Sequence, residues 1–112
     1  MNIPRLYSGE DGQSHWGEIE LEMESATFSR MMNATGIQLG NSPARRQSDW
    51  HNAPRRQFVV ILTGEVDFEI GDGSKRHFAP GDIFLAEDLV GQGHRGQTGS
   101  ELRTTLYVPL AK

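Results

Sequence analysis

Two histidines, His51 and His94, stand near the ends of a stretch in which short apolar runs alternate with turn signals. An imidazole exchanges a proton near neutral pH, so either histidine can act as a general acid or base. Asp49, Glu87 and Asp88 are nearby carboxylates that can orient one of the rings. Two acids in a row beside a turn are more often solvated, and we favour that interpretation of Glu87 and Asp88. If the intervening strands fold back over one another, the two rings meet inside one cavity.

Side chains near the first histidine supply candidate contacts to a ligand. Adjacent residues of a strand point to opposite faces, so if Gln57 faces inward, Arg55 shares its direction and Arg56 points out. Arg55 can then clamp a carboxylate of a substrate, or else pair with the acidic N-terminal strand. Trp50 can stack on a ligand at a pocket mouth, or fill the core or a subunit contact. The candidate ligand-binding residues are Trp50, Arg55, Gln57 and Glu87.

Alternating patterns and turn residues predict the strands that position these groups. Residues 58–62 are apolar at every position, whereas residues 66–70 alternate as a strand with one wet face does. Asp72-Gly73 signals a tight hairpin, and Pro80-Gly81 signals a second turn. Many short strands without a long helix between them indicate an antiparallel sandwich or barrel. Further strands are expected within residues 6–12, 15–24, 35–39, 46–51, 83–86 and 102–108.

The spacing of histidines and glycines in residues 49–95 matches a family pattern. The residues that carry it are His51, Gln57, Gly64, Gly81, Gly91 and His94. The pattern resembles the cupin superfamily, whose motifs run G-x5-H-x-H-x3or4-E-x6-G and G-x5-P-x-G-x2-H-x3-N. The resemblance implies a small single-domain cupin, an all-β double-stranded β-helix or jelly-roll barrel of antiparallel strands.

The same resemblance implies a metal site, from which this chain departs. Cupins usually hold a metal with three histidines and one glutamate. Here Asn52 or Ala53 stands where the second histidine belongs, and Gln57 replaces the glutamate. The remaining candidate metal ligands are His51, Gln57 and His94, an uncharged set that holds a cation weakly. The implied cofactor is a divalent transition metal, namely Fe, Ni, Zn, Mn or Cu.

Length, charge and composition bound the remaining possibilities. We expect one domain over residues 1–112, with a motif core at 49–95 and flanking strands in 3–40 and 101–109. The formal net charge of −4 argues against a nucleic-acid partner. No run approaches the ~20 apolar residues of a membrane helix. The chain has no cysteine and no signal-peptide pattern at its start, so we expect a cytoplasmic protein with no membrane partner.

The fully apolar run at residues 58–62 predicts that two chains associate. A barrel strand with a wet outer side should alternate, so both faces of this strand are expected to be buried. One face then lines the barrel, and the other meets another sheet or a second subunit. We therefore expect a homodimer.

Together these features favour a barrel pocket for a small organic molecule, lined by His51, Gln57 and His94. The leading hypothesis is a metal-dependent enzyme of dioxygenase, lyase or isomerase type, with His51 and His94 as its catalytic residues. One alternative is a non-catalytic small-molecule binding or sensor module. The other is a metal-free isomerase that uses the two histidines as acid and base.

Overall fold

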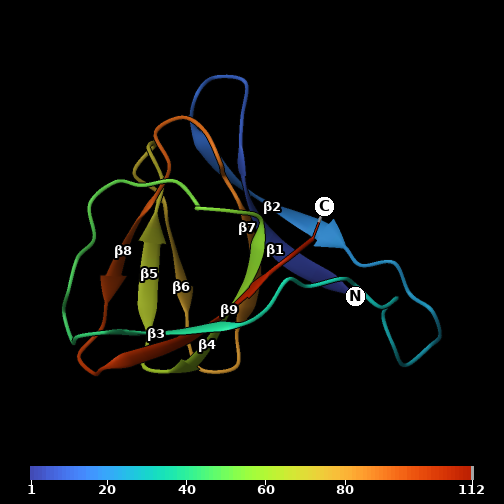
Figure 1. The fold of residues 1–112 in the computed structure, drawn as a ribbon. Helices are drawn as coiled ribbons and strands as arrows, with labels where there is room; N and C mark the ends of the chain where they lie inside the picture. The colour runs from blue at the N-terminus through green and yellow to red at the C-terminus, as the bar shows by residue number, and fades with distance from the viewer. Residues whose placement is uncertain (112) are drawn as a thin grey trace.

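The computed structural model describes residues 1–111, which form nine strands joined by loops and turns. The strands make two facing sheets, one with the order β2-β1-β7-β4-β9-β3 and one with the order β6-β5-β8 (Figure 1). Within residues 1–111, no helix is long and apolar enough to cross a membrane. The strands are β1 (Asn2–Ser8), β2 (Ser14–Glu20), β3 (Gln38–Ser42), β4 (Gln57–Thr63), β5 (Val66–Glu69), β6 (Lys75–Phe78), β7 (Ile83–Glu87), β8 (Arg95–Thr98) and β9 (Arg103–Pro109).

Both predicted turns are confirmed. Gly73 has a φ of 87° in the hairpin between β5 and β6, and Gly81 has a φ of 93° in the turn before β7. Glycine enters this left-handed region without steric cost, because it has no Cβ. These turns fold β5, β6 and β7 back over one another, so the two sheets come to face each other.

One strand pair differs from the wholly antiparallel arrangement that was expected. β1 runs parallel to β7, with Leu6 opposite Ala86, while the remaining strand pairs are antiparallel. Parallel neighbours need a long connection rather than a hairpin. Here strands β2 to β6 supply that connection. The alternation of apolar and polar residues along a strand does not reveal which distant strand it pairs with.

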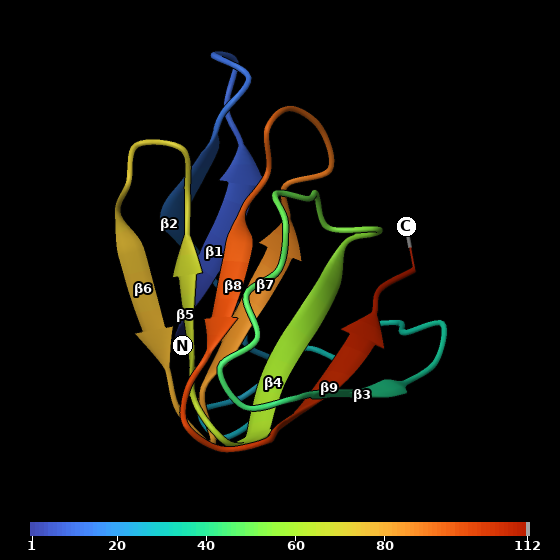
Figure 2. The same cartoon turned by 90° about the vertical axis from the view of Figure 1, so that its left-hand side faces the viewer.

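Several predicted strands have different boundaries. β1 covers Asn2–Ser8 where residues 6–12 were expected, and β3 covers Gln38–Ser42 where residues 35–39 were expected. The strand expected over residues 15–24 ends at Glu20, because Glu20 pairs with Asn2, where β1 begins. Residues 46–51 form only isolated bridges, one joining Gln47 to Gln97 and the other joining His51 to His94. Figure 2 shows this green segment passing beside β8 at the open edge of the smaller sheet.

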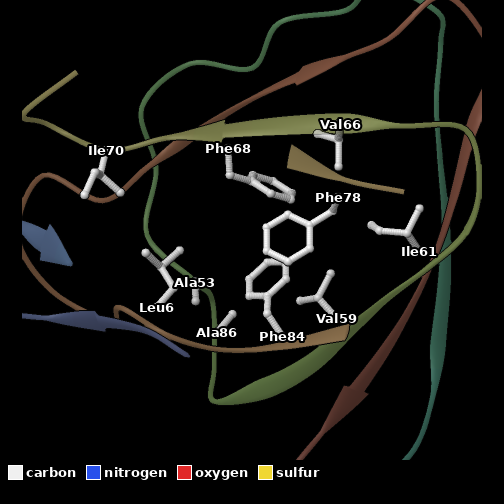
Figure 3. Packing of buried hydrophobic residues seen from close by; sticks show 10 residues of the cluster. All are labelled: Leu6, Ala53, Val59, Ile61, Val66, Phe68, Ile70, Phe78, Phe84 and Ala86. Atoms are coloured by element: carbon white, nitrogen blue, oxygen red, sulfur yellow. The ribbon is translucent and has the colours of Figure 1, made fainter. Parts of the chain in front are cut away.

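Aromatic rings fill the space between the two sheets. Phe68, Phe78 and Phe84 lie with their ring centres 4.8–5.9 Å apart, in the tilted or edge-on contacts that aromatic pairs prefer (Figure 3). Val59 and Ile61 project from β4 into the same cluster. Since the rings close one part of the interior, the space for a ligand lies between them and the histidine-bearing segments.

The opposite face of β4 packs into a second, outer cluster. Phe58, Leu85 and Ile3 are its buried members. Both faces of β4 are therefore apolar, as the continuous run predicts. The segment of residues 24–34 passes over part of this outer cluster and exposes two large apolar side chains, Phe28 at 69% and Met31 at 85%.

The homodimer stays a prediction, and the outer cluster offers a test. Light scattering at micromolar concentration should give twice the 12.5 kDa chain mass. Replacing Phe28 and Met31 with serine should shift the protein toward the monomer, because both side chains are exposed beside the outer cluster. Val90→Ser, at another exposed apolar position, is the matched control. A wild-type mass of one chain would contradict the prediction.

Candidate functional site

His51 and His94 are held together by their own backbones. The amide of each donates to the carbonyl of the other at 2.9 Å. Opposed residues of an antiparallel pair send their side chains to the same face. The two ring centres accordingly lie 4.5 Å apart, with 56° between the ring planes. The expectation that the histidines meet holds, although 42 residues lie between them in the chain.

A glycine makes this close approach possible. Gly93 has a φ of 79°, and a Cβ at this position would lie 2.0 Å from the carbonyl oxygen of His51. Only glycine combines this backbone conformation with room for the facing chain. Gly93 therefore lets the loop before β8 place His94 directly opposite His51.

A buried carboxylate orients His94. The Nδ1–H of His94 donates to Oδ2 of Asp88 at 2.6 Å, and the hydroxyl of Ser14 donates to the same oxygen at 2.8 Å. Asp88 is fully buried and His94 is 5% exposed. Because the carboxylate holds Nδ1, the nitrogen that can meet a bound molecule is Nε2. The favoured interpretation of Asp88 as a solvated turn residue was wrong. The loop after β7, which carries Asp88, packs against the hairpin formed by β1 and β2.

A backbone carbonyl orients the His51 ring, again through its Nδ1 atom. Its Nδ1–H donates to the carbonyl oxygen of Asp49 at 2.8 Å. A carbonyl can only accept, so the neutral ring carries its lone pair on Nε2. His51 is more exposed than His94, and it lies on the solvent side of the pair. Both rings therefore offer the same nitrogen to a ligand.

The two histidines line a cavity of about 410 Å³ between the sheets. This volume lies in the range of small-molecule sites. Its apolar wall includes Val59, Phe68 and Phe84 from the core, and Gln57 and Arg55 line it as well. Gln57 and Arg55 lie on the cavity side of the chain, as the alternation of neighbouring residues predicts. Arg56 points the other way and donates to Glu87 on the outer face at 2.8 Å.

Three arginines, Arg46, Arg55 and Arg103, also line the cavity, and Arg55 donates to the side-chain oxygen of Gln38 at 2.8 Å. Arg103 is partly buried and donates to the hydroxyls of Thr98 and Thr105, at 3.3 and 3.4 Å. Burial lowers the pKa of the Arg103 guanidinium from its ordinary value, an effect that the neighbouring Tyr107 opposes. Arginine nevertheless stays protonated in proteins, so the cavity carries positive charge.

Two predicted ligand contacts lie away from the cavity. Glu87 points to the outer face of the larger sheet, where Arg5 and Arg56 donate to its carboxylate. Burial disfavours the charged form of Glu87, but these two guanidinium groups outweigh it and lower the pKa of the carboxyl. Trp50 packs under Arg95, whose guanidinium carbon lies 4.8 Å from the ring centre. The structure corrects both placements. Glu87 follows the cavity-lining Ala86 in β7 and so points to the opposite face, whereas Trp50 lies outside the strands and packs against Arg95.

The other two histidines lie outside the cavity. His77 donates to the carboxylates of Asp67 and Glu65 at 2.6 Å each, on the exposed face of the smaller sheet. These bonds, with Asp67 the larger cause, raise the pKa of His77. His15 contacts Asp11 at 2.9 Å.

Ser14, Arg46 and Arg103 belong to this site but were not predicted for it from the sequence. Arg103 alternates with the apolar residues of β9 and shares its face with Thr105 and Tyr107, which is a signal of a polar barrel lining. That signal is ambiguous by itself, because a polar face more often meets water. Ser14 and Arg46 lie in segments whose local pattern shows no partner.

The cavity donors fit a divalent metal poorly. Among residues 1–111, no group of three His, Cys, Asp or Glu side chains is arranged to hold a metal ion. The available donors are two imidazoles and the amide of Gln57, and they share the cavity with three guanidinium groups. A cation bound there would meet positive charge, and the cavity lining offers it no carboxylate ligand, because Asp88 is bonded to the far side of the His94 ring.

Solved structures resemble this chain in fold. The Schizosaccharomyces pombe Cnp3 cupin domain has a TM-score of 0.58 at 12% identity, covering 100% of this chain and 83% of that one. A sugar phosphate isomerase from a cupin superfamily of Silicibacter pomeroyi has a TM-score of 0.54 at 18% identity, covering 100% and 71%. A cupin superfamily protein from Desulfitobacterium hafniense has a TM-score of 0.51 at 15% identity, covering 84% of each chain.

The chain therefore has the cupin fold, and the resemblance seen in the sequence is confirmed at that level. No protein-family model matches the sequence, and no curated protein matches it. At these identities the neighbours establish the architecture, and the chemistry must be argued from the cavity.

Gly93 provides a matched test of how the histidine pair is built. Gly93→Ala should destabilise the protein by about 3 kcal/mol or more, because the new Cβ meets the His51 carbonyl at 2.0 Å. Gly73 also has a positive φ but has open space around it, so Gly73→Ala should cost only the backbone strain of about 1–2 kcal/mol. Urea denaturation measures both values. Equal losses would show that Gly93 is not needed for the close approach.

Proposed function

We propose that this chain is a metal-free isomerase that moves protons on a small α-hydroxy carbonyl compound held in the barrel cavity. The observation that carries the proposal is the buried 2.6 Å hydrogen bond from His94 to Asp88, with the His51 ring 4.5 Å from that of His94. A histidine oriented by a carboxylate is an effective general base, because the carboxylate stabilises the imidazolium that forms. The fold itself serves many chemistries, so this pair supplies the specific argument.

The reaction follows from the two Nε2 atoms. Nε2 of His94 removes the proton from the hydroxyl-bearing carbon, the C–H electron pair forms a C=C bond, and the carbonyl π pair moves onto oxygen. His51 carries the hydroxyl proton from one oxygen to the other. His94 then returns its proton to the former carbonyl carbon, so atoms and charge balance. The cationic cavity lining stabilises the negative oxygen that develops between these steps.

The spacing of the rings favours isomerisation over two-base epimerisation. A carbon attacked from both faces needs bases separated by about two van der Waals contacts, or roughly 7 Å. The ring centres of His51 and His94 are 4.5 Å apart, so both groups approach a ligand from one side. Proton transfer between neighbouring atoms on one face of the substrate suits this geometry.

Two further observations support the proposal. The Silicibacter pomeroyi neighbour is described as a sugar phosphate isomerase, so a protein of this fold is assigned to the same reaction class. The metal-dependent enzyme expected from the family pattern requires a cation among the cavity arginines, which is electrostatically unfavourable. We therefore place the metal-free mechanism first.

Proton exchange across a panel of candidate substrates tests the proposal. Aldoses, ketoses and their phosphates are incubated with the protein in D2O, and proton NMR follows deuterium entry beside the carbonyl. We expect exchange with at least one compound. We expect His94→Gln to slow it by about 100-fold or more, as for loss of a general base.

The matched control is His77→Gln, which removes a histidine from the exposed face of the smaller sheet. This variant should exchange at the wild-type rate. Equal rates in wild type and His94→Gln would overturn the mechanism. Binding of a compound without any exchange would instead favour the non-catalytic binding module.

Elemental analysis of protein purified without a histidine tag tests the metal-dependent alternative. After incubation with Fe²⁺, Ni²⁺, Zn²⁺, Mn²⁺ or Cu²⁺ and removal of free ion, we expect well below one metal per chain. Three guanidinium groups and the lack of a carboxylate ligand in the described cavity are the reason. One metal per chain that disappears in the His51→Ala/His94→Ala double variant would restore the metal-dependent enzyme.

A further inference from the structure

Arg103 occupies an unusual position for a charged side chain. It projects from β9 into the cavity and is partly buried. Its guanidinium carbon lies 5.7 Å from the ring centre of Phe68, and its described neighbours are neutral hydroxyl groups, those of Thr98, Thr105 and Tyr107. A guanidinium has five N–H donors, so two long bonds to neutral hydroxyls leave most of its capacity for another group.

Several arginines outside the cavity pair with carboxylates, whereas Arg45 and Arg76 form no ion pair among the described residues. Arg5 and Arg56 bind the carboxylate of Glu87, and Arg95 binds that of Glu69. Within residues 1–111, no such ion pair forms at Arg103, Arg46 or Arg55. Although the formal net charge of the chain is −4, three arginines without a carboxylate partner among the described residues therefore line one cavity.

A buried acceptor points to a second ligand group. The amide oxygen of Gln57 is shielded from solvent and lacks a hydrogen-bond partner among the described residues, while Gln57 as a whole is 4% exposed. A buried acceptor left without a donor costs about 1–3 kcal/mol. A hydroxyl group of a bound molecule would satisfy it, and a cation would not be needed.

From these observations we infer that the cavity takes a small hydroxylated organic anion, whose carboxylate or phosphate group binds at Arg103 with Arg46 and Arg55. Phe68 connects the two ends of the site: its ring centre lies 5.7 Å from the Arg103 guanidinium carbon and 5.7 Å from the His94 ring centre. A molecule lying across this ring therefore reaches both groups. The inference deepens the proposed function, because it names the charged group of the substrate of that same site.

The anionic group also explains how a substrate is held in register. Two or more guanidinium groups bind a carboxylate or phosphate by charge-assisted, directional hydrogen bonds. Binding at that end leaves the neutral, hydroxylated part of the molecule beside Gln57 and the histidine pair. Arg103 is thus a substrate-binding residue, separate from the proton-transfer groups.

Calorimetric titration of the full chain at low ionic strength tests the inference. The probes are glycerol 3-phosphate, glycerate and neutral glycerol, which share hydroxyl groups and differ in charge. We expect one or both anions to bind and glycerol not to bind at the same concentration. Arg103→Met should weaken anion binding at least tenfold. Arg95→Met should change it less than twofold, because Arg95 also lies against an aromatic ring but pairs with Glu69.

Each outcome decides the inference. Tighter binding of the phosphate or of the carboxylate supports it and identifies the anionic group. Absence of binding by both anions to the folded wild type, or equal binding by Arg103→Met, overturns it. If Arg103→Met fails to fold, the exposed pair Arg46→Met/Arg55→Met replaces it under the same criterion. Calorimetry measures binding independently of turnover. Anion binding without deuterium exchange would therefore contradict only the proposed isomerase. Deuterium exchange without anion binding would contradict only this inference.

Discussion

The backbone pairing of His51 with His94 is the constraint on which the site depends. Two mutual hydrogen bonds of 2.9 Å set both rings on one face, and Gly93 gives the facing chain the room to approach. The rest of the barrel supports this contact, since the turns at Gly73 and Gly81 return the chain to it. The geometry of the histidine pair is therefore set by the main chain.

The arginines that line the cavity lack carboxylate partners among the described residues, whereas several arginines on the outer surface have them. Acidic side chains on the surface pair with arginines such as Arg56 and Arg95, or face water. The cavity keeps its arginines without such partners among residues 1–111, beside a fully buried Asp88 that is committed to His94. This lining is the basis for the proposed anionic ligand and for the proposed stabilisation of an oxyanion during proton transfer. The same property explains why a metal is a poor occupant.

The sequence predicted local features well and distant ones poorly. The strands around residues 58–86, their turns and the meeting of the two histidines follow from alternation and motif spacing. The parallel pairing of β1 with β7 could not be predicted, because the alternation of residues along a strand does not indicate its partner or direction. Asp88 and Arg103 were likewise missed or misassigned, since a carboxylate in a loop and an arginine in a strand usually meet water. Only the folded chain shows that Ser14 and Thr98 are their partners.

The hydrogen bond from Ser14 to Asp88 connects the carboxylate that orients His94 to the N-terminal hairpin. Ser14 begins β2, and the β1–β2 hairpin joins the rest of the sheet through three residue pairs between β1 and β7. A short seam of this kind opens more readily than the centre of a sheet. Each opening withdraws the hydroxyl from the carboxylate and lets water reach it. In the proposed mechanism, the lifetime of the β1–β7 pairing thus sets how long His94 keeps a dry, oriented carboxylate partner.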